Sequence, residues 1–252
     1  QTKLVATSWV CFSTGYVHDI DALGRACRER DAFLVLDAIQ GLGQLTLDAK
    51  KCGAHFVSCQ GAKWMCAPLG SGFLYASDEL PKEITPRQVG WFAMEHNHAD
   101  YLDRNIAVKQ NANRFAMGTV PLPSVYGLRR ACEIFLAAGP LRCQQRATAL
   151  TDRIEVAARE AGMEVYSDRS ARRCAIIYLE LSGRPPAAGT APGAGAGLAA
   201  VPGMPVKPGI VEQLDNANVV YSIRSGRLRL SPHWYTSDAE IDTVCEIIAG
   251  KS

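Results

Sequence analysis

The chain has 252 residues, of which 48% are hydrophobic and 21% are charged, and this composition excludes a disordered protein. Its net charge of +2 and its scattered basic residues give no reason to expect a nucleic-acid partner. No run of about 18 apolar residues occurs, so we expect no membrane span.

The first half of the chain alternates short apolar runs with helical segments. The runs are continuous, which is typical of strands buried on both faces. The expected strands cover 4–8, 32–36, 55–59 and 72–76, and the expected helices cover 18–30 and 47–51. This order predicts an α/β fold with a mostly parallel sheet flanked by helices.

The second half carries different signals. Residues 78–120 show little periodicity, and we expect a strand pair and irregular loops there. Helices should follow at 124–138 and 141–161, and the second of them leads out of a large domain at 1–140 into a smaller α+β domain at 141–252.

Three short strands and one helix are expected in the smaller domain. The strands cover 174–181, 219–223 and 227–230, and Ser237 with Glu240 forms a capping box that begins the last helix. Residues 183–203 are rich in Ala, Gly and Pro, which is typical of a low-complexity insertion.

Nine cysteines occur, with no C-x-x-C pair, so neither a zinc ribbon nor a dithiol redox motif is predicted. Reduced, buried thiols are the simplest interpretation, and they indicate a cytoplasmic protein, with an organelle as the alternative. His96 and His98, with Asp100 close by, are too few ligands at too irregular a spacing, and we expect no metal.

The most informative residues follow two of the expected strands. Asp37 ends the buried run at 33–36, Gln40 comes three residues later, and Lys63 follows the strand at 55–59. Each has an ordinary structural explanation, as a helix cap or a solvated side chain. Together they supply the carboxylate and the amine that pyridoxal phosphate requires, and burial would keep the lysine partly neutral.

These motifs resemble those of the class V aminotransferase group of fold-type I pyridoxal phosphate enzymes. The resemblance begins with D-A-I-Q, continues with a lysine 26 residues after the aspartate, and extends through K-W-x-x-x-P-x-G-x-G-F-L-Y. The segments R-F-x-x-G-T at 114–119 and S-x-R-x-G-R-x-R-x-S-P-H-x-Y at 222–235 also match. The group includes cysteine desulfurases, selenocysteine lyases, kynureninases and isopenicillin N epimerase-like proteins.

The resemblance implies roles for the first set of residues. Lys63 would form the Schiff base with the cofactor and move the α-proton of an amino-acid substrate. Asp37 would pair with the pyridine nitrogen, and Gln40 would bind the phenolic oxygen. Many relatives have Ser-Gly-His-Lys where this chain has Gln60-Gly61-Ala62-Lys63. Gln60 could still bind the cofactor phosphate, whereas Ala62 could not.

Further roles are implied for residues in the two matching downstream segments. Gly118 and Thr119 would reach the phosphate of the other subunit's cofactor, which implies a homodimer with a shared active site. Arg229 would hold the substrate carboxylate, with Arg224 as a second candidate for the same pocket. A surface position on a strand is the alternative for Arg229.

Two features qualify the expected activity. In the family the large domain begins well upstream of the point matched by Gln1, so we expect this chain to lack the ring-stacking residue and the first phosphate loop. The loop between Arg224 and Arg229 is short and has no cysteine, which counts against a persulfide-forming desulfurase. Transamination, epimerisation and β-elimination remain open, and the alternative to an enzyme is an inactive or truncated relative that serves as a binding or dimerisation partner.

Overall fold

The computed structural model describes residues 2–80, 84, 86–95, 107–170, 172–181 and 209–251. The chain forms two compact units. The first unit comprises Gln1–Trp9 and Asp19–Gly139, and the second comprises Val10–His18 and Pro140–Ser252. The low-complexity stretch at 183–203 lies outside the described residues.

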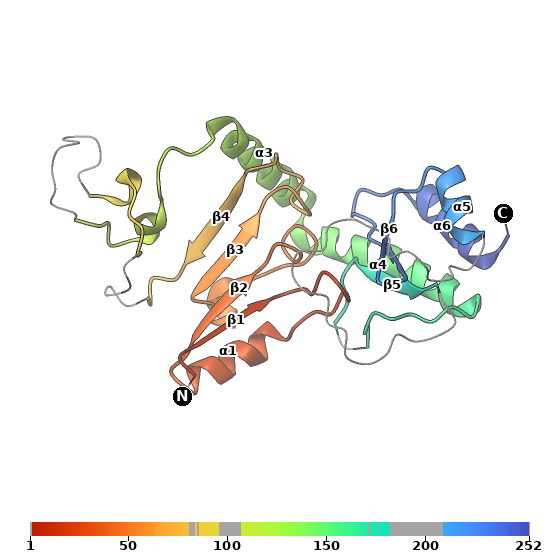
Figure 1. Ribbon diagram of the computed structural model, residues 1–252, viewed down its shortest axis with the longest axis horizontal. Helices are drawn as coiled ribbons and strands as arrows, with labels where there is room; N and C mark the ends of the chain where they lie inside the picture. The colour runs from red at the N-terminus through yellow and green to blue at the C-terminus, as the bar shows by residue number, and fades with distance from the viewer. Residues whose placement is uncertain are drawn as a thin grey trace. The chain divides into compact units, whose positions relative to one another are not determined.

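The first unit is built on a four-stranded sheet in the order β1-β2-β3-β4 (Figure 1). Its strands are β1 (Leu4–Ser8), β2 (Phe33–Asp37), β3 (Phe56–Gln60) and β4 (Gly72–Ala76). The first three run parallel, and β4 runs antiparallel to β3. The predicted fold class, a mostly parallel sheet flanked by helices, is confirmed. The antiparallel strand was not predicted, and it follows from the short 61–71 connection, which is too brief for a parallel crossover.

Two helices connect the parallel strands. Asp19 caps α1 (Ile20–Arg28) by accepting a hydrogen bond from the Ala22 amide, and Asp48 caps α2 (Ala49–Cys52) in the same way. The two helices approach closely at Gly24, where an added Cβ atom would lie 1.7 Å from the Cys52 carbonyl oxygen. Leu34 and Leu36 are fully buried beneath them.

The segment after β4 differs from the expected strand pair. Its described part holds two 3-10 turns, η1 (Trp91–Ala93) and η2 (Ala112–Phe115), and one antiparallel bridge between Met94 and Val108. His96, His98 and Asp100 lie outside the described residues. The unit ends with α3 (Leu122–Ala138).

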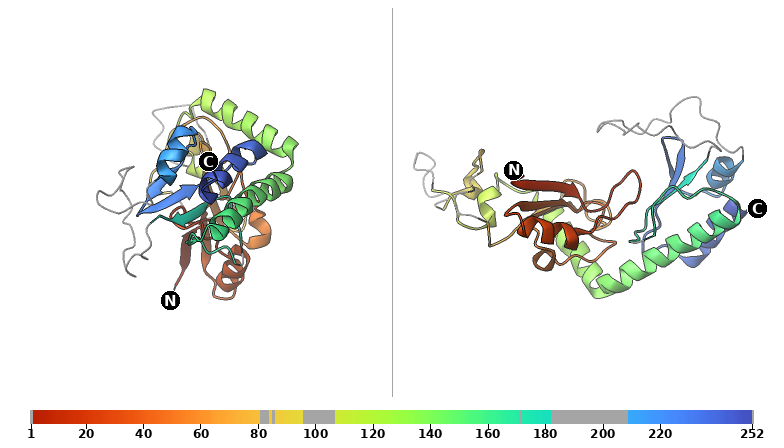
Figure 2. Two further views of the ribbon diagram at one scale, coloured as in Figure 1. Left: turned by 90° about the vertical axis from the view of Figure 1, so that its right-hand side faces the viewer. Right: turned by 90° about the horizontal axis from the view of Figure 1, so that it is seen from below.

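In its described residues, the second unit packs three helices against a three-stranded antiparallel sheet (Figure 2). The strands are β5 (Ile177–Glu180), β6 (Ser222–Arg224) and β7 (Arg227–Leu230), in the order β5-β7-β6; the helices are α4 (Pro140–Glu160), α5 (Ile210–Asn216) and α6 (Asp238–Ala249). The capping box of Ser237 and Glu240 is present at the start of α6, as predicted. One face of the sheet joins the helices in an apolar core that includes Leu150, Leu179 and Leu228.

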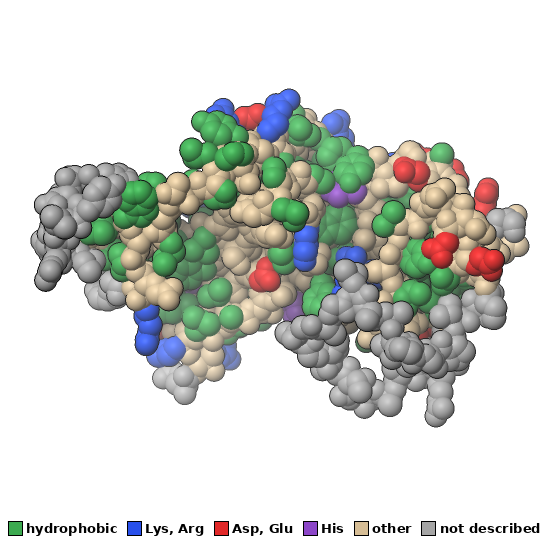
Figure 3. All heavy atoms as spheres, turned by 45° about the horizontal axis from the view of Figure 1, so that its top comes forward, with side chains coloured by type: hydrophobic (Ala, Val, Ile, Leu, Met, Phe, Trp, Pro, Cys, Tyr) green, Lys and Arg blue, Asp and Glu red, His purple; other side chains and the backbone are tan. Residues whose placement is uncertain are grey.

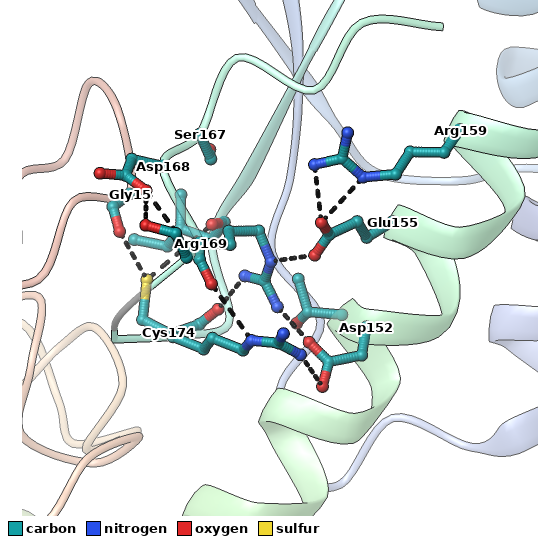
Figure 4. A network of polar contacts seen from close by, with 12 residues as sticks. Gly15, Asp152, Glu155, Arg159, Ser167, Asp168, Arg169 and Cys174 are labelled. Atoms are coloured by element: carbon teal, nitrogen blue, oxygen red, sulfur yellow. Dashed lines mark hydrogen bonds and ion pairs between the residues drawn. The ribbon is translucent and has the colours of Figure 1, made fainter. Parts of the chain in front are cut away.

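A buried arginine fixes the segment between α4 and β5 to α4 (Figure 4). The Arg169 guanidinium pairs with Asp152 and, at 2.7 Å, with Glu155, and it also donates to the Cys174 carbonyl oxygen at 2.7 Å. Arg159 binds the second side of the Glu155 carboxylate at 2.9 Å. The charge of Arg169 is therefore fully compensated inside the unit.

None of the described helices combines the length and apolar character needed to cross a lipid bilayer.

Candidate functional site

The carboxylate of Asp37 stands at the carboxyl edge of the parallel sheet. Asp37 pairs across β2 with Ser8 on β1 and Ser58 on β3. Its Oδ1 atom accepts a hydrogen bond from the Ile39 amide at 3.0 Å, and its carbonyl oxygen accepts one from the Trp9 amide at 2.9 Å. The side chain is exposed, and no other described residue hydrogen-bonds its carboxylate. It is therefore held in place with one oxygen open to a ligand.

Gln40 is buried and oriented by the residue that follows Lys63. The indole Nε1 of Trp64 donates to the Oε1 atom of Gln40 at 3.0 Å. Since this contact fixes the amide, the Gln40 side-chain nitrogen remains a donor, and it binds no described residue. A short polar contact thus links the segment after β2 to the turn after β3.

Lys63 lies in the turn between β3 and β4. Its side chain is exposed, so the burial that was expected to keep the amine partly neutral is not found in this chain. The turn is tightly packed: the Gly61 amide donates to the Ser71 carbonyl oxygen, and the Cys66 amide donates to that of Lys63, both at 2.9 Å. A Cβ atom on Gly61 would lie 2.7 Å from Ser71 Oγ, so this close approach requires glycine. The backbone that carries Lys63 is consequently well defined.

The charges of Asp37 and Lys63 both affect the pKa of one buried thiol, that of Cys59. Burial, together with the negative charge of Asp37, raises the pKa of Cys59 to about 11, and the positive charge of Lys63 opposes the shift. Cys59 is buried in β3, directly after Ser58, the residue that pairs with Asp37. Asp37 ends β2, Gln40 follows it, and Lys63 follows β3, so the three residues lie at the carboxyl ends of two adjacent parallel strands.

Three further predicted site residues also lie in the first unit: Gln60, Gly118 and Thr119. Gln60 ends β3, opposite Gly72, with an exposed side chain. Thr119 is exposed between η2 and α3, and Gly118 packs against the Trp91 indole. In the described part of the chain, no hydrogen bond connects these residues to Asp37, Gln40 or Lys63.

Arg229 and Arg224 lie in the second unit, on one face of its sheet. Arg229 on β7 is flanked by Tyr178 on β5 and Ser222 on β6. Burial, together with the nearby positive charge of Arg224, lowers the pKa of Arg229, and Tyr178 opposes the shift. The Nε atoms of both arginines are buried and have no hydrogen-bond partner.

Two residues important to this geometry were not predicted from the sequence. Trp64 appeared to be a packing residue, and only its position directly after Lys63 could have indicated a polar role. Tyr178 is fully buried in β5, where its hydroxyl donates to the Phe12 carbonyl oxygen at 2.7 Å. That contact joins residues 166 positions apart in the chain, and no local pattern signals it. Among the described residues, no group of three or more His, Cys, Asp and Glu side chains is arranged to hold a metal ion.

Known proteins support a family assignment. The chain is 26% identical over 168 residues to a probable cysteine desulfurase of Methanothermobacter thermautotrophicus, a match that covers 66% of this chain and 41% of that protein. It is 23% identical over 253 residues to the uncharacterized aminotransferase YcbU of Bacillus subtilis, covering 100% of this chain and 60% of YcbU. The chain thus spans roughly half the length of these relatives.

Solved structures share the fold. The apo cysteine desulfurase from Thermococcus onnurineus NA1 superposes with a TM-score of 0.78 at 22% identity, over 98% of this chain and 59% of that one. The cystine C-S lyase C-DES, in complex with cysteine persulfide, gives a TM-score of 0.78 at 20% identity, over 98% and 61%. The family model "Aminotransferase class-V" matches residues 1–243. The chain therefore belongs to the class V aminotransferase family, a family of pyridoxal phosphate-dependent enzymes.

Proposed function

We propose that the chain is part of a pyridoxal phosphate-dependent enzyme that acts on an amino acid, with Lys63 as the residue that binds the cofactor covalently. The observation that carries the proposal is the arrangement at the carboxyl edge of the sheet. There Asp37 has an open carboxylate, and Gln40 has an amide donor fixed by Trp64, the residue after Lys63. The charges of Asp37 and Lys63 both act on the Cys59 thiol.

The donor set fits the cofactor. The Asp37 carboxylate suits a protonated pyridine nitrogen, and the free amide hydrogens of Gln40 suit a phenolic oxygen. When bound, pyridoxal phosphate withdraws electrons from the substrate α-carbon. Lys63 would serve as the base, accepting the α-proton at its Nζ atom and returning it at the position that the reaction outcome requires.

Arg229 is proposed to bind the substrate carboxylate. Its partly buried guanidinium has an unsatisfied donor, and a planar guanidinium can bind a carboxylate through two parallel hydrogen bonds. The assigned roles of Lys63 and Arg229 are common to transamination, epimerisation and β-elimination.

A persulfide-forming reaction is less well supported. β6 and β7 are joined by a turn of two residues, Ser225 and Gly226, both with positive φ angles of 50° and 77°. This is the backbone of a tight hairpin, and it contains no cysteine to accept sulfur. We therefore favour an aminotransferase or lyase activity that needs no sulfur acceptor in this loop.

A homodimer is part of the proposal. Hydrophobic side chains are exposed on α3 and in the segment before it. The top of Figure 3 shows hydrophobic side chains gathered beside Lys and Arg side chains. We call this surface the α3 patch; it comprises Leu69, Met117, Val120, Leu122, Val125 and Tyr126. An exposed apolar surface of this kind suits a second copy of the chain, to whose cofactor phosphate Gly118 and Thr119 would then be directed.

Absorbance spectroscopy tests the proposed function. Purified protein with added pyridoxal phosphate should develop a visible band that is absent from the Lys63→Ala variant. The Lys50→Ala variant, which removes an exposed lysine on α2, should keep the band. A wild-type chain that stays colourless would contradict the proposal and favour a binding or dimerisation role.

A further inference from the structure

The sheet of the second unit has two contrasting faces. Because side chains alternate along a strand, the leucines of Arg227-Leu228-Arg229-Leu230 enter the helical core and the arginines face the other way. The cross-strand pairs place six polar side chains on this second face. They are Tyr178, Glu180, Ser222, Arg224, Arg227 and Arg229.

This polar face is mostly closed to solvent. Tyr178, Glu180 and Arg227 are buried, and Ser222, Arg224 and Arg229 are half-buried. Residues of the 10–18 segment contribute to the cover: the Phe12 carbonyl oxygen binds the Tyr178 hydroxyl, and the Phe12 ring lies 5.8 Å from the Arg224 guanidinium carbon. Charges here are therefore poorly hydrated and need partners.

Two other arginines of this unit have such partners. Arg227 forms a buried ion pair with Glu180, and its guanidinium lies 3.5 Å from the centre of the Tyr166 ring. Arg169 is held by two carboxylates of α4 (Figure 4). Each of these two charges is thus compensated by a carboxylate, although the Nη2 atom of Arg227 is buried without a hydrogen-bond partner.

Arg224 and Arg229 are different. Neither guanidinium forms a hydrogen bond or an ion pair with any described residue, and the Nε atom of each is buried. The hydroxyl of Ser222, beside Arg229 in the sheet, is also buried and unpartnered. Arg224 lies diagonally across the strands from Arg229, and their like charges repel. Glu180, the one acidic side chain among the described strand residues of this face, is already paired with Arg227.

We propose that Arg224 and Arg229 together bind a molecule with two negatively charged groups, so that the substrate is an amino acid with an acidic side chain. This substrate class rests on the proposed function. One carboxylate would bind Arg229, with Ser222 as an additional donor, and the other would bind Arg224. A substrate with a single carboxylate would leave one of two poorly hydrated positive charges without a partner.

Calorimetric titration of the chain without cofactor tests this proposal. The probes are succinate and glutarate, each compared with its half-amide, which has the same shape and one charge less. We expect at least one diacid to bind roughly 10- to 100-fold more tightly than its half-amide, the effect of one charge-assisted hydrogen-bonded contact. Equal affinity for diacid and half-amide, or no binding of either, would overturn the proposal.

Two variants test which arginine binds which carboxylate of the diacid. Arg224→Gln should lower the affinity for the diacid to that for the half-amide, whereas Arg229→Gln should weaken binding of both. Arg130→Gln, which changes an exposed arginine on α3, should leave all affinities unchanged. The comparison of diacid with half-amide on the wild-type chain needs no variant, so it stands even if a substitution impairs folding.

The test separates this inference from the proposed function. Diacid preference is measured without cofactor, and it should persist in the Lys63→Ala variant. If the chain fails to bind pyridoxal phosphate but keeps the preference, the proposed function falls and the diacid site stands. If the cofactor binds at Lys63 but aspartate and glutamate perturb its spectrum no more than asparagine and glutamine, the diacid assignment falls alone.

Discussion

At the scale of single residues, we assign Trp64 the role of a positioning residue. Its indole nitrogen holds Gln40 with the amide donors directed away from Trp64. Trp64→Phe removes this hydrogen bond, worth about 1 kcal/mol, and preserves an aromatic side chain in the buried position. We expect pyridoxal phosphate to bind roughly fivefold more weakly, with a shifted absorption maximum, in a spectroscopic titration.

A matched control is available in the second unit. Trp234→Phe should leave both the affinity for the cofactor and the absorption maximum unchanged. An unaltered maximum in Trp64→Phe would show that the indole contributes packing alone.

Cysteine reactivity gives a second prediction at this scale. Burial raises the pKa of Cys174 to about 11. Burial also acts on Cys11, but hydrogen bonds with Ser13 and Thr14 outweigh it and lower the pKa of that thiol. Since the thiolate is the reactive form, Cys11 should be alkylated by iodoacetamide near pH 8, whereas Cys174 should react only as the pH approaches about 11.

Peptide mapping by mass spectrometry measures both rates in one sample. Cys59, whose pKa is also raised to about 11 by burial, serves as a second slow thiol within the first unit. Comparable alkylation of Cys11 and Cys174 at pH 8 would be inconsistent with these environments.

At the scale of secondary-structure elements, the ion pairs of Arg169 connect α4 to the approach to β5. Replacing the arginine with leucine leaves the carboxylates of Asp152 and Glu155 with fewer partners. We expect the free energy of unfolding to fall by about 2–4 kcal/mol, the cost of breaking a buried pair reduced for the partial exposure of Asp152. Urea unfolding measures the change, and the exposed Arg129→Leu control should alter it by less than about 0.5 kcal/mol.

The same pairs make stability depend on pH in a defined direction. Burial acts to raise the pKa of Glu155, but hydrogen bonds from Arg169 and Arg159 outweigh it and hold the pKa below its ordinary value of 4.5. A carboxyl group with a lowered pKa in the folded state stabilises the fold above its ordinary pKa, and this contribution disappears as the pH falls through the folded-state value. The stability difference between wild type and Arg169→Leu should therefore shrink below pH 4.5, and a constant difference would refute this origin.

The elements also show what local sequence can and cannot predict. Continuous apolar runs placed β1, β2 and β3 to within one residue at each end, because burial in a sheet imposes that composition. The antiparallel direction of β4 depends on the tight 61–71 turn, which apolar content does not reveal. α5 escaped prediction because it has only seven residues and one buried side chain, Leu214.

The candidate site likewise has features that the sequence predicts and features that only the structure shows. Asp37, Gln40 and Lys63 were candidates because strand ends are readable from local patterns. The contacts that orient them, such as the Trp64 hydrogen bond, join side chains 24 residues apart and depend on the folded sheet. The sequence could not show that Arg224 and Arg229 lack ion-pair partners. They alternate with apolar residues just as Arg227 does, yet Arg227 forms an ion pair.

At the scale of the whole molecule, the α3 patch predicts self-association. Tyr126 and Leu122 are 67% and 57% exposed, respectively, which is costly for apolar side chains in a monomer. Light scattering coupled to size-exclusion chromatography should give the mass of a dimer for the wild-type chain. Tyr126→Glu should shift the mass toward that of the monomer.

Val220 provides the control for that experiment. It is 95% exposed and lies outside the α3 patch, so Val220→Glu adds the same charge without affecting the association. A wild-type monomer, or an equal loss of association in both variants, would refute the α3 patch as the dimer surface.

Covalent attachment of the cofactor to Lys63 is tested most directly by peptide mapping after borohydride reduction. The loaded protein is reduced, digested and analysed by mass spectrometry. If Lys63 holds the cofactor, the peptide that contains Lys63 should carry the mass of the reduced cofactor, and peptides containing Lys50 or Lys51 should carry no such addition. Cofactor attached to another lysine, or distributed among several, would contradict the assignment of this site.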